Sequence, residues 1–82
     1  MFYIYILESE TTGRLYIGQT SDLNDRVRRH NAGFNLSTKN RGPWRILYSR
    51  QMPTRSDAVL LETKLKSFKS SVRIRAWIKA QL

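Results

Sequence analysis

The N-terminal part of the chain contains two short apolar segments separated by a polar one. Residues 2–7 and 15–17 are rich in β-branched and aromatic side chains, which favour β-strands. The polar residues between them end in Gly13 and are typical of a turn. The pattern therefore predicts an N-terminal β-hairpin.

The side chains of this hairpin fall into two sets, because successive residues of a strand point to opposite faces of a sheet. If Tyr5 pairs opposite Tyr16, both lie on one face together with Tyr3. The opposite face then carries Phe2, Ile4, Ile6, Leu15 and Ile17. We expect the second face to form the core, and the tyrosines to point outward or into a cleft.

A short helix is predicted between Gly18 and Gly33. Thr20 or Ser21 can cap its N-terminus. Its first turn carries negative charges, which are favourable at the positive end of the helix dipole: Asp22 and Asp25.

The apolar stripe of this helix contains Leu23 and Val27, which are four residues apart. Arg26 and His30 have the same spacing and border the stripe on one side. Two further basic side chains of the helix point elsewhere, Arg28 and Arg29.

The second half of the chain begins with a segment of low periodicity, residues 31–43, which predicts a long loop. Residues 44–48 return to a strand pattern, and Pro53 ends it. Thr54 can cap a helix over residues 55–69, in which the apolar positions keep helical spacing.

A third helix follows, with Ser70 or Ser71 as its cap. One of its faces is apolar and carries Ile74, Trp77, Ile78 and Leu82. The order of elements is thus β-β-α-β-α-α. Adjacent antiparallel strands with helices at their flanks indicate an α+β fold, and a length of 82 residues indicates a single domain, residues 1–82.

The composition narrows the classes of function. Hydrophobic residues make up 40% of the chain and aromatic residues 11%, enough for one compact core. There is no cysteine, which excludes disulfides, thiolate metal sites and cysteine nucleophiles, so a metal would be held by oxygen or by His30. No apolar run approaches the length of a membrane span, and we expect a cytoplasmic protein without membrane contact.

The charge is strongly positive and unevenly distributed. Fifteen Lys and Arg residues oppose six Asp and Glu, a net charge of +9. Four carboxylates lie in the first 25 residues, whereas the segment from Arg26 to Ser56 contains basic residues and no carboxylate. Such an excess indicates a polyanionic partner, above all nucleic acid, because Lys and Arg contacts to phosphates supply most non-specific affinity. A basic surface that is merely solvated is the alternative.

Glu62 has the most informative position among the carboxylates. It lies four residues after Ala58 and three before Leu65, so the helix turns it toward the face that packs on the sheet. As a structural residue it would be a rim glutamate paired with a lysine or with Arg26. As a functional residue it would be a hard oxygen ligand for Mg²⁺ or a similar ion, which needs only one or two protein carboxylates.

Arg26 and His30 together suit phosphodiester cleavage, since an arginine can hold a phosphate and a histidine can exchange protons near neutral pH. Each alone would more often be a surface residue. Tyr5 and Tyr16 are either packing residues or catalytic ones. A tyrosine could act as a general base only if neighbouring cations or a proton acceptor lowered its pKa.

The residues that could carry chemistry follow one another in a distinctive order: Tyr3-Ile4-Tyr5, ten residues, Tyr16-Ile17-Gly18, then Arg26, His30 and Glu62. This order resembles that of the GIY-YIG nuclease superfamily. The likeness extends over nearly the whole chain and is greatest to small single-domain bacterial members, which resemble the N-terminal domain of the excinuclease C subunit.

The resemblance implies a three-stranded antiparallel sheet flanked by helices and one divalent ion, Mg²⁺ or Mn²⁺, held by Glu62. It further implies hydrolysis of a DNA phosphodiester bond by a tyrosine-assisted water. Tyr5 would be the general base and His30 its proton acceptor, while Tyr16 would help to position the water or the scissile phosphate. Arg26 would stabilise the developing charge.

Two positions depart from the family pattern. Tyr3 stands where the first glycine of the family name would be, and no asparagine follows Asn40, although many members place one after the metal-binding glutamate. The second departure leaves open a non-catalytic nucleic-acid-binding module with the same fold.

The expected function is therefore a metal-dependent DNA endonuclease that recognises structure or backbone more than sequence, with a role in DNA repair or recombination and a partner protein for targeting. The expected DNA-binding residues are basic side chains outside the catalytic set: Arg28, Arg29, Lys39, Arg41, Arg45 and Lys66.

Overall fold

The computed structural model describes residues 1–33 and 42–82. Within them the elements are β1 (Phe2–Ser9), β2 (Leu15–Thr20), α1 (Leu23–Asn31), β3 (Trp44–Met52), α2 (Arg55–Ser67) and α3 (Ser71–Gln81). The strands form one antiparallel sheet in the order β2-β1-β3. The predicted α+β fold and its order of elements are confirmed. Most of the loop predicted over residues 31–43 lies outside the described residues.

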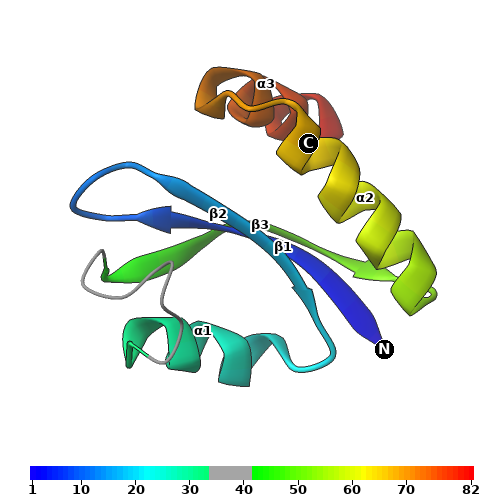
Figure 1. Cartoon of the computed structure of the whole chain (residues 1–82), viewed down its shortest axis with the longest axis horizontal. Coiled ribbons are helices and arrows are strands. Elements are labelled where there is room, and N and C mark those ends of the chain that lie inside the picture. The colour runs from blue at the N-terminus through cyan, green and yellow to red at the C-terminus, as the bar shows by residue number, and fades with distance from the viewer. Residues whose placement is uncertain (34–41) are drawn as a thin grey trace.

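The sheet is covered by helices on both faces (Figure 1). Helix α1 lies on one side, and α2 and α3 lie together on the other. Each side has its own apolar cluster: β1 and β2 contribute Ile4, Ile6 and Ile17 toward α2 and α3. On the α1 side, the cluster consists of Tyr5, Leu7 and Trp44, packed against Tyr16, Leu23 and Val27.

This second cluster corrects the prediction that the tyrosine face points outward or into a cleft. Tyr5 is only 1% exposed, because Leu23 and Val27 of α1 pack over the same face. Leu7, which shares that face with Tyr5, is fully buried there. The two apolar residues of α1 therefore suffice to close a core over a strand face that is tyrosine-rich.

The register of the hairpin also differs from the predicted one. Tyr5 lies opposite Gly18 and not opposite Tyr16, whose partner is Leu7. The turn sets this register: the Ser9 amide donates to the Arg14 carbonyl at 2.9 Å, and the Ser9 hydroxyl accepts from two amides of the turn. Because the shift is an even number of residues, the predicted division of side chains between the two faces still holds.

The helix caps follow local sequence rules, with one correction. Asp22, and not Thr20 or Ser21, is the N-cap of α1; its carboxylate accepts from the Asp25 amide at 3.0 Å. Thr20 instead accepts from the Asp22 amide and thereby holds the preceding turn. The predicted caps of the other two helices are confirmed, with Thr54 for α2 and Ser70 for α3.

Glu8 links three elements on the α3 side of the molecule. Its carboxylate forms ion pairs with Arg45 of β3 and with Arg75 of α3, the latter at 2.6 Å. Arg75 also donates to the Gly13 carbonyl at 3.2 Å. These contacts fix the hairpin turn against α3.

In the part of the chain that the structure describes, no helix has the length and apolarity needed to cross a membrane.

Candidate active site

Tyr5 and His30 form a buried hydrogen bond at the centre of the candidate site. Tyr5 is in the middle of β1, His30 is in the last turn of α1, and the hydroxyl oxygen lies 3.1 Å from His30 Nε2. Both side chains are about 1% exposed. The two residues are 25 positions apart in the chain, and they meet because α1 packs across the strand face that carries Tyr5.

The electrostatics of this pair define its protonation. Burial raises the pKa of the Tyr5 hydroxyl, as does the neighbouring Tyr16, whereas Arg26 lowers it in part. Burial lowers the pKa of His30 below its ordinary value, and Arg26 lowers it further. At neutral pH the pair is therefore a neutral phenol and a neutral imidazole. The tautomer of His30 decides which of the two groups donates.

A tyrosine that acts as a general base was expected to have its pKa lowered by neighbouring cations. The pKa of Tyr5 is instead raised. Arg26 does act to lower this pKa, but burial under α1 is the larger effect. A stable phenolate at Tyr5 is therefore disfavoured.

Tyr16 lies beside this pair. Its ring centroid is 6.3 Å from that of Tyr5 in a stacked arrangement and 4.6 Å from the imidazole of His30. Tyr16 is partly exposed, because β2 is the edge strand of the sheet. The tyrosine and histidine rings thus extend from a buried hydrogen bond to an accessible surface.

Gly18 permits this packing. A Cβ atom at position 18 would lie 2.7 Å from Cζ of Tyr5, closer than Cβ atoms approach other atoms in real proteins. Glycine is therefore required where β2 passes the ring of Tyr5, for lack of space and not for backbone conformation. Gly18 is part of the Tyr16-Ile17-Gly18 motif. Its role in making space for the Tyr5 ring is shown only by the strand register, which places it opposite Tyr5.

Arg26 is partly buried on the same side of α1 as His30, and its charge acts on both Tyr5 and His30. The neighbouring arginines are engaged differently: Arg28 and Arg29 form ion pairs with Asp25 at 2.7 and 3.1 Å. The prediction that Arg26 and His30 share one side of the helix, with Arg28 and Arg29 elsewhere, agrees with these contacts.

Glu62 approaches the site from the other side of the sheet, on α2. Its side chain is 20% exposed, and its charge is among the causes that raise the pKa of Tyr5. Its carboxylate forms an ion pair with Lys66 at 2.8 Å, one helical turn away. The pairing of Glu62 with a lysine, which the sequence offered as the structural alternative, is therefore present. The charge of Glu62 still acts on Tyr5.

A divalent ion fits this carboxylate in its donor chemistry. Glu62 offers hard oxygen atoms at a partly exposed position, as Mg²⁺ or Mn²⁺ requires. Residues 1–33 and 42–82 contain no group of three or more His, Cys, Asp or Glu side chains placed to hold a metal. At Glu62, water and substrate phosphates would have to complete the coordination shell.

Of the six predicted DNA-binding residues, the four that the structure describes lie on three different elements, α1, β3 and α2. Arg45 forms an ion pair with Glu8, while Lys66 lies beside Glu62. Arg28 and Arg29 are exposed on α1. Lys39 and Arg41 lie outside the described residues. Contact with DNA stays a prediction for all six.

Asn31 is a positioning residue that the sequence did not indicate. Its side-chain carbonyl accepts from the Trp44 amide at 2.6 Å, and its amide donates to the Trp44 carbonyl at 3.2 Å. This double hydrogen bond fastens the end of α1 to the start of β3, directly after His30. No local pattern could reveal it, because the partner is the backbone of a residue 13 positions away.

Comparisons with known proteins indicate the family and the fold of the chain. The sequence profile described as the GIY-YIG catalytic domain matches residues 1–75. UPF0213 proteins from Staphylococcus aureus strains N315 and MW2 are each 32% identical over 74 residues, which cover 89% of this chain and 89% of each relative. The solution structure of a UPF0213 protein from Bacillus halodurans is similar with a TM-score of 0.62 and 29% identity, over 98% of this chain and 85% of that one.

The profile covers the hairpin, α1, β3 and α2, and so includes every residue of the tyrosine, histidine and glutamate cluster. With the bacterial relatives and the shared fold, the chain belongs to the GIY-YIG family.

Proposed function

We propose that this protein is a divalent-metal-dependent endonuclease that hydrolyses phosphodiester bonds in DNA. The observation that carries the proposal is the buried Tyr5–His30 hydrogen bond, which leads to the partly exposed Tyr16. A phenol hydrogen-bonded to a neutral imidazole has a proton acceptor in place, as activation of a water requires.

The pKa values determine how the proton moves. Because burial raises the pKa of Tyr5, its hydroxyl would release its own proton only in the same step in which it accepts another. In the proposed step, Tyr5 accepts the proton of the attacking water while its own proton passes to His30 Nε2. In the tautomer whose Nε2 accepts from the Tyr5 hydroxyl, His30 would take up that proton, and its lowered pKa keeps it neutral beforehand.

Arg26 and Glu62 provide the electrostatic part of the proposal. The guanidinium of Arg26 is close enough to affect both Tyr5 and His30, and would stabilise negative charge that develops on the phosphate. Glu62 would hold Mg²⁺ or Mn²⁺, which when bound acts as a Lewis acid on a phosphoryl oxygen.

The Glu62–Lys66 ion pair favours a second candidate, a non-catalytic nucleic-acid-binding module. In that case Lys66 would neutralise Glu62 permanently and the basic surface alone would act. The absence of an asparagine after Asn40 fits this candidate as well.

A role in DNA repair or recombination, and targeting by a partner protein, remain proposals that depend on which candidate holds.

The deciding experiment is incubation of the purified protein with plasmid and branched DNA, with Mg²⁺ or Mn²⁺ and with chelator. Cleavage should depend on the divalent ion and be lost in a Glu62→Gln variant, which keeps the size of the side chain and removes its charge. Glu10→Gln is the matched control, since Glu10 is an exposed carboxylate in the hairpin turn. DNA binding without cleavage under every condition would favour the non-catalytic module.

A further inference from the structure

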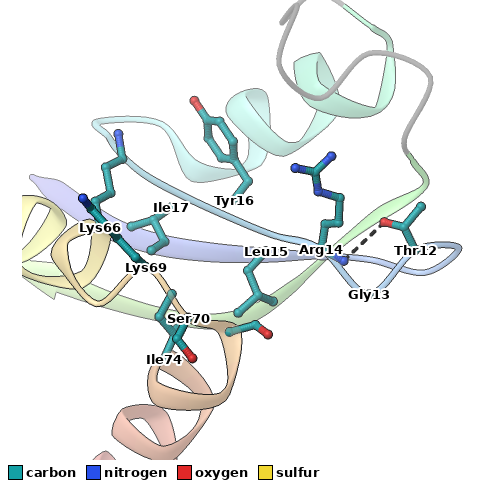
Figure 2. Close-up of a pocket in the computed structure, with 11 residues that line it drawn as sticks. Thr12, Gly13, Arg14, Leu15, Tyr16, Ile17, Lys66, Lys69, Ser70 and Ile74 are labelled. Carbon is teal, nitrogen blue, oxygen red and sulfur yellow. Dashed lines mark hydrogen bonds between the residues drawn. The ribbon is translucent and has the colours of Figure 1, made fainter.

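A cavity of about 610 Å³ lies along the exposed edge of β2, next to the candidate active site. Its walls come from the hairpin, from the end of α2 and from the start of α3 (Figure 2). Leu15 and Ile17 of β2 and Ile74 of α3 provide apolar lining. The volume is within the range of sites that enclose small organic ligands.

The polar lining of this cavity is cationic. It contains Arg14, Lys66 and Lys69, and none of the described residues that line it is a carboxylate. Hydroxyl groups of Thr12, Tyr16, Ser70 and Ser71 also line it. Helix α3 begins at Ser71, so the positive end of its dipole adds to the field of the three cations. The arrangement is suited to a ligand with both an anionic and an apolar part.

Two lining residues connect the cavity to the candidate active site. Tyr16 contacts His30 through its ring and also lines the cavity. Lys66 forms the ion pair with Glu62 and lines the cavity as well. Figure 2 shows Tyr16 and Arg14 rising from the same side of β2, while Leu15 points toward Ser70 and Ile74.

The backbone at Arg14 is held by hydrogen bonds within the hairpin turn and from α3. The Arg14 amide donates to the Thr12 hydroxyl at 3.2 Å, and its carbonyl accepts from the Ser9 amide. Arg75, held by Glu8, donates to the carbonyl of Gly13 next to it. The turn that carries Arg14 is thus held against α3, and the width of the cavity follows from it.

We infer that this cavity binds one nucleotide of the DNA strand that is cut, next to the scissile phosphate. The phosphates on either side of that nucleotide would contact Arg14 and Lys69, and its sugar or base would cover the apolar lining. The strand would then run along the edge of β2, from Arg26 past Tyr16 to the start of α3. This inference rests on the proposed function, since it names where that substrate lies.

Cations beside an edge strand can also serve only to prevent pairing with another sheet. That role needs no ligand, and it predicts that any cation of equal exposure is equivalent for DNA binding. The two explanations can therefore be separated by comparing cations inside and outside the cavity.

The first test measures binding of a short single-stranded oligonucleotide to the full-length protein without divalent ion, by fluorescence anisotropy at several salt concentrations. The variant Arg14→Gln/Lys69→Asn removes two cavity cations; asparagine suits the positive φ of 51° at Lys69. We expect binding at 0.15 M salt to weaken roughly fourfold for each phosphate that the variant can no longer neutralise, and the salt slope to fall by about 1.4 if two contacts to the single strand are lost. Lys64→Gln/Lys79→Gln is the control, because it removes the same charge from exposed positions outside the cavity.

The second test locates the DNA directly. The chain has no cysteine, so Ser71→Cys introduces a single thiol into the cavity, and Ala80→Cys introduces one at an exposed position near the other end of α3. Bound oligonucleotide should slow alkylation of the first thiol by iodoacetamide several-fold and leave the second unchanged. Inorganic phosphate at equal phosphate concentration should not protect either thiol; protection by phosphate alone would assign the cavity to a small anion and overturn the inference.

The outcomes separate this inference from the proposed function. If DNA is bound and cut while both thiols react at unchanged rates and both double variants bind equally, the cavity is not a nucleotide site and the nuclease proposal stands. If the cavity thiol is protected but no cleavage occurs with any divalent ion, the cavity belongs to a binding module. If no DNA is bound at all, both are wrong.

Discussion

The backbone of Gly18 lies against the ring of Tyr5, so closely that a Cβ atom at position 18 would be 2.5 Å from the Tyr5 hydroxyl oxygen. This hydroxyl is also the group that is hydrogen-bonded to Nε2 of His30. The hydrogen bond between Tyr5 and His30 therefore depends on a glycine at position 18. The three residues come from three different elements, β1, α1 and β2.

Gly18→Ala should displace the Tyr5 ring and lengthen or break its hydrogen bond to His30. Overpacking of this kind costs about 1–3 kcal/mol of stability, and we expect cleavage to fall by more than the decrease in folded protein explains. Urea unfolding and a DNA cleavage assay measure the two effects. Gln19→Ala is the control, since residue 19 faces the opposite side of β2; equal activity in both variants would show that the Tyr5 position is not critical.

Tyr5→Phe removes only the hydroxyl of the pair. The ring packing remains, but the hydrogen bond to His30 Nε2 is lost, and we expect a destabilisation of about 1–2 kcal/mol. Cleavage should drop by orders of magnitude, because in the proposed step the Tyr5 hydroxyl connects water to His30. Tyr3→Phe makes the same chemical change on the same face of β1 and should retain activity. Wild-type cleavage in Tyr5→Phe would reduce Tyr5 to a packing residue.

His30 makes stability depend on pH in a defined window. Its pKa in the folded state is below the ordinary value of 6.5, mainly through burial, with Arg26 as a second cause. Below about pH 6.5 the unfolded chain therefore binds a proton that the folded protein does not, so the free energy of unfolding should fall as pH decreases from about 6.5.

Urea unfolding between about pH 7 and 5.5 measures this effect. The decline should be absent in His30→Gln, whatever the absolute stability of that variant. Glu8 and Asp25, whose carboxyl pKa values are lowered by their arginine partners, contribute only at pH below about 4.5 and do not interfere. An identical decline in wild type and variant would assign it to another group.

Glu8→Gln should lower the thermal unfolding midpoint. The two carboxylate oxygens of Glu8 accept from Arg45 and Arg75, whereas a glutamine would turn its amide group toward one of the two guanidinium groups. A fall of about 4–8 °C corresponds to about 1 kcal/mol for a domain of this size, and we expect at least that, measured by circular dichroism. Glu10→Gln should change the midpoint little, and an equal effect of both would contradict a special role for Glu8.

DNA affinity should decrease steeply with salt. The basic residues outnumber the acidic ones by a wide margin, with none of the acidic ones between Arg26 and Ser56. A plot of log K against log salt concentration, from about 50 to 200 mM, should have a slope that corresponds to several phosphate contacts. Affinity that does not change with salt would exclude a phosphate-based interface.

Features that depend on near neighbours in the chain were predictable. The strands and helices follow from apolar periodicity, and the caps Thr54 and Ser70 follow from hydroxyl residues at helix starts. The cap of α1 was misplaced because three polar residues in a row, Thr20 to Asp22, all suit that position. The candidate site residues were found by type and order, which the motif preserves.

Relationships between distant residues could not be predicted in the same way. The hairpin register depends on hydrogen bonds of the Ser9–Arg14 turn, and a shift of two residues replaced Tyr16 by Gly18 as the partner of Tyr5. The burial of Tyr5 depends on which sheet face α1 covers. The pairing of Asn31 with the backbone of Trp44 has no sequence signature at all.

The sequence alone determined the elements, the α+β class, the positive charge and the set of candidate residues, because each of these follows from composition or from contacts a few residues long. Only the tertiary structure decided that Tyr5 is buried against His30 and that a cationic cavity opens beside Tyr16. Those features arise where three separate elements converge, and solvent exclusion at that point sets the pKa values on which the chemistry depends.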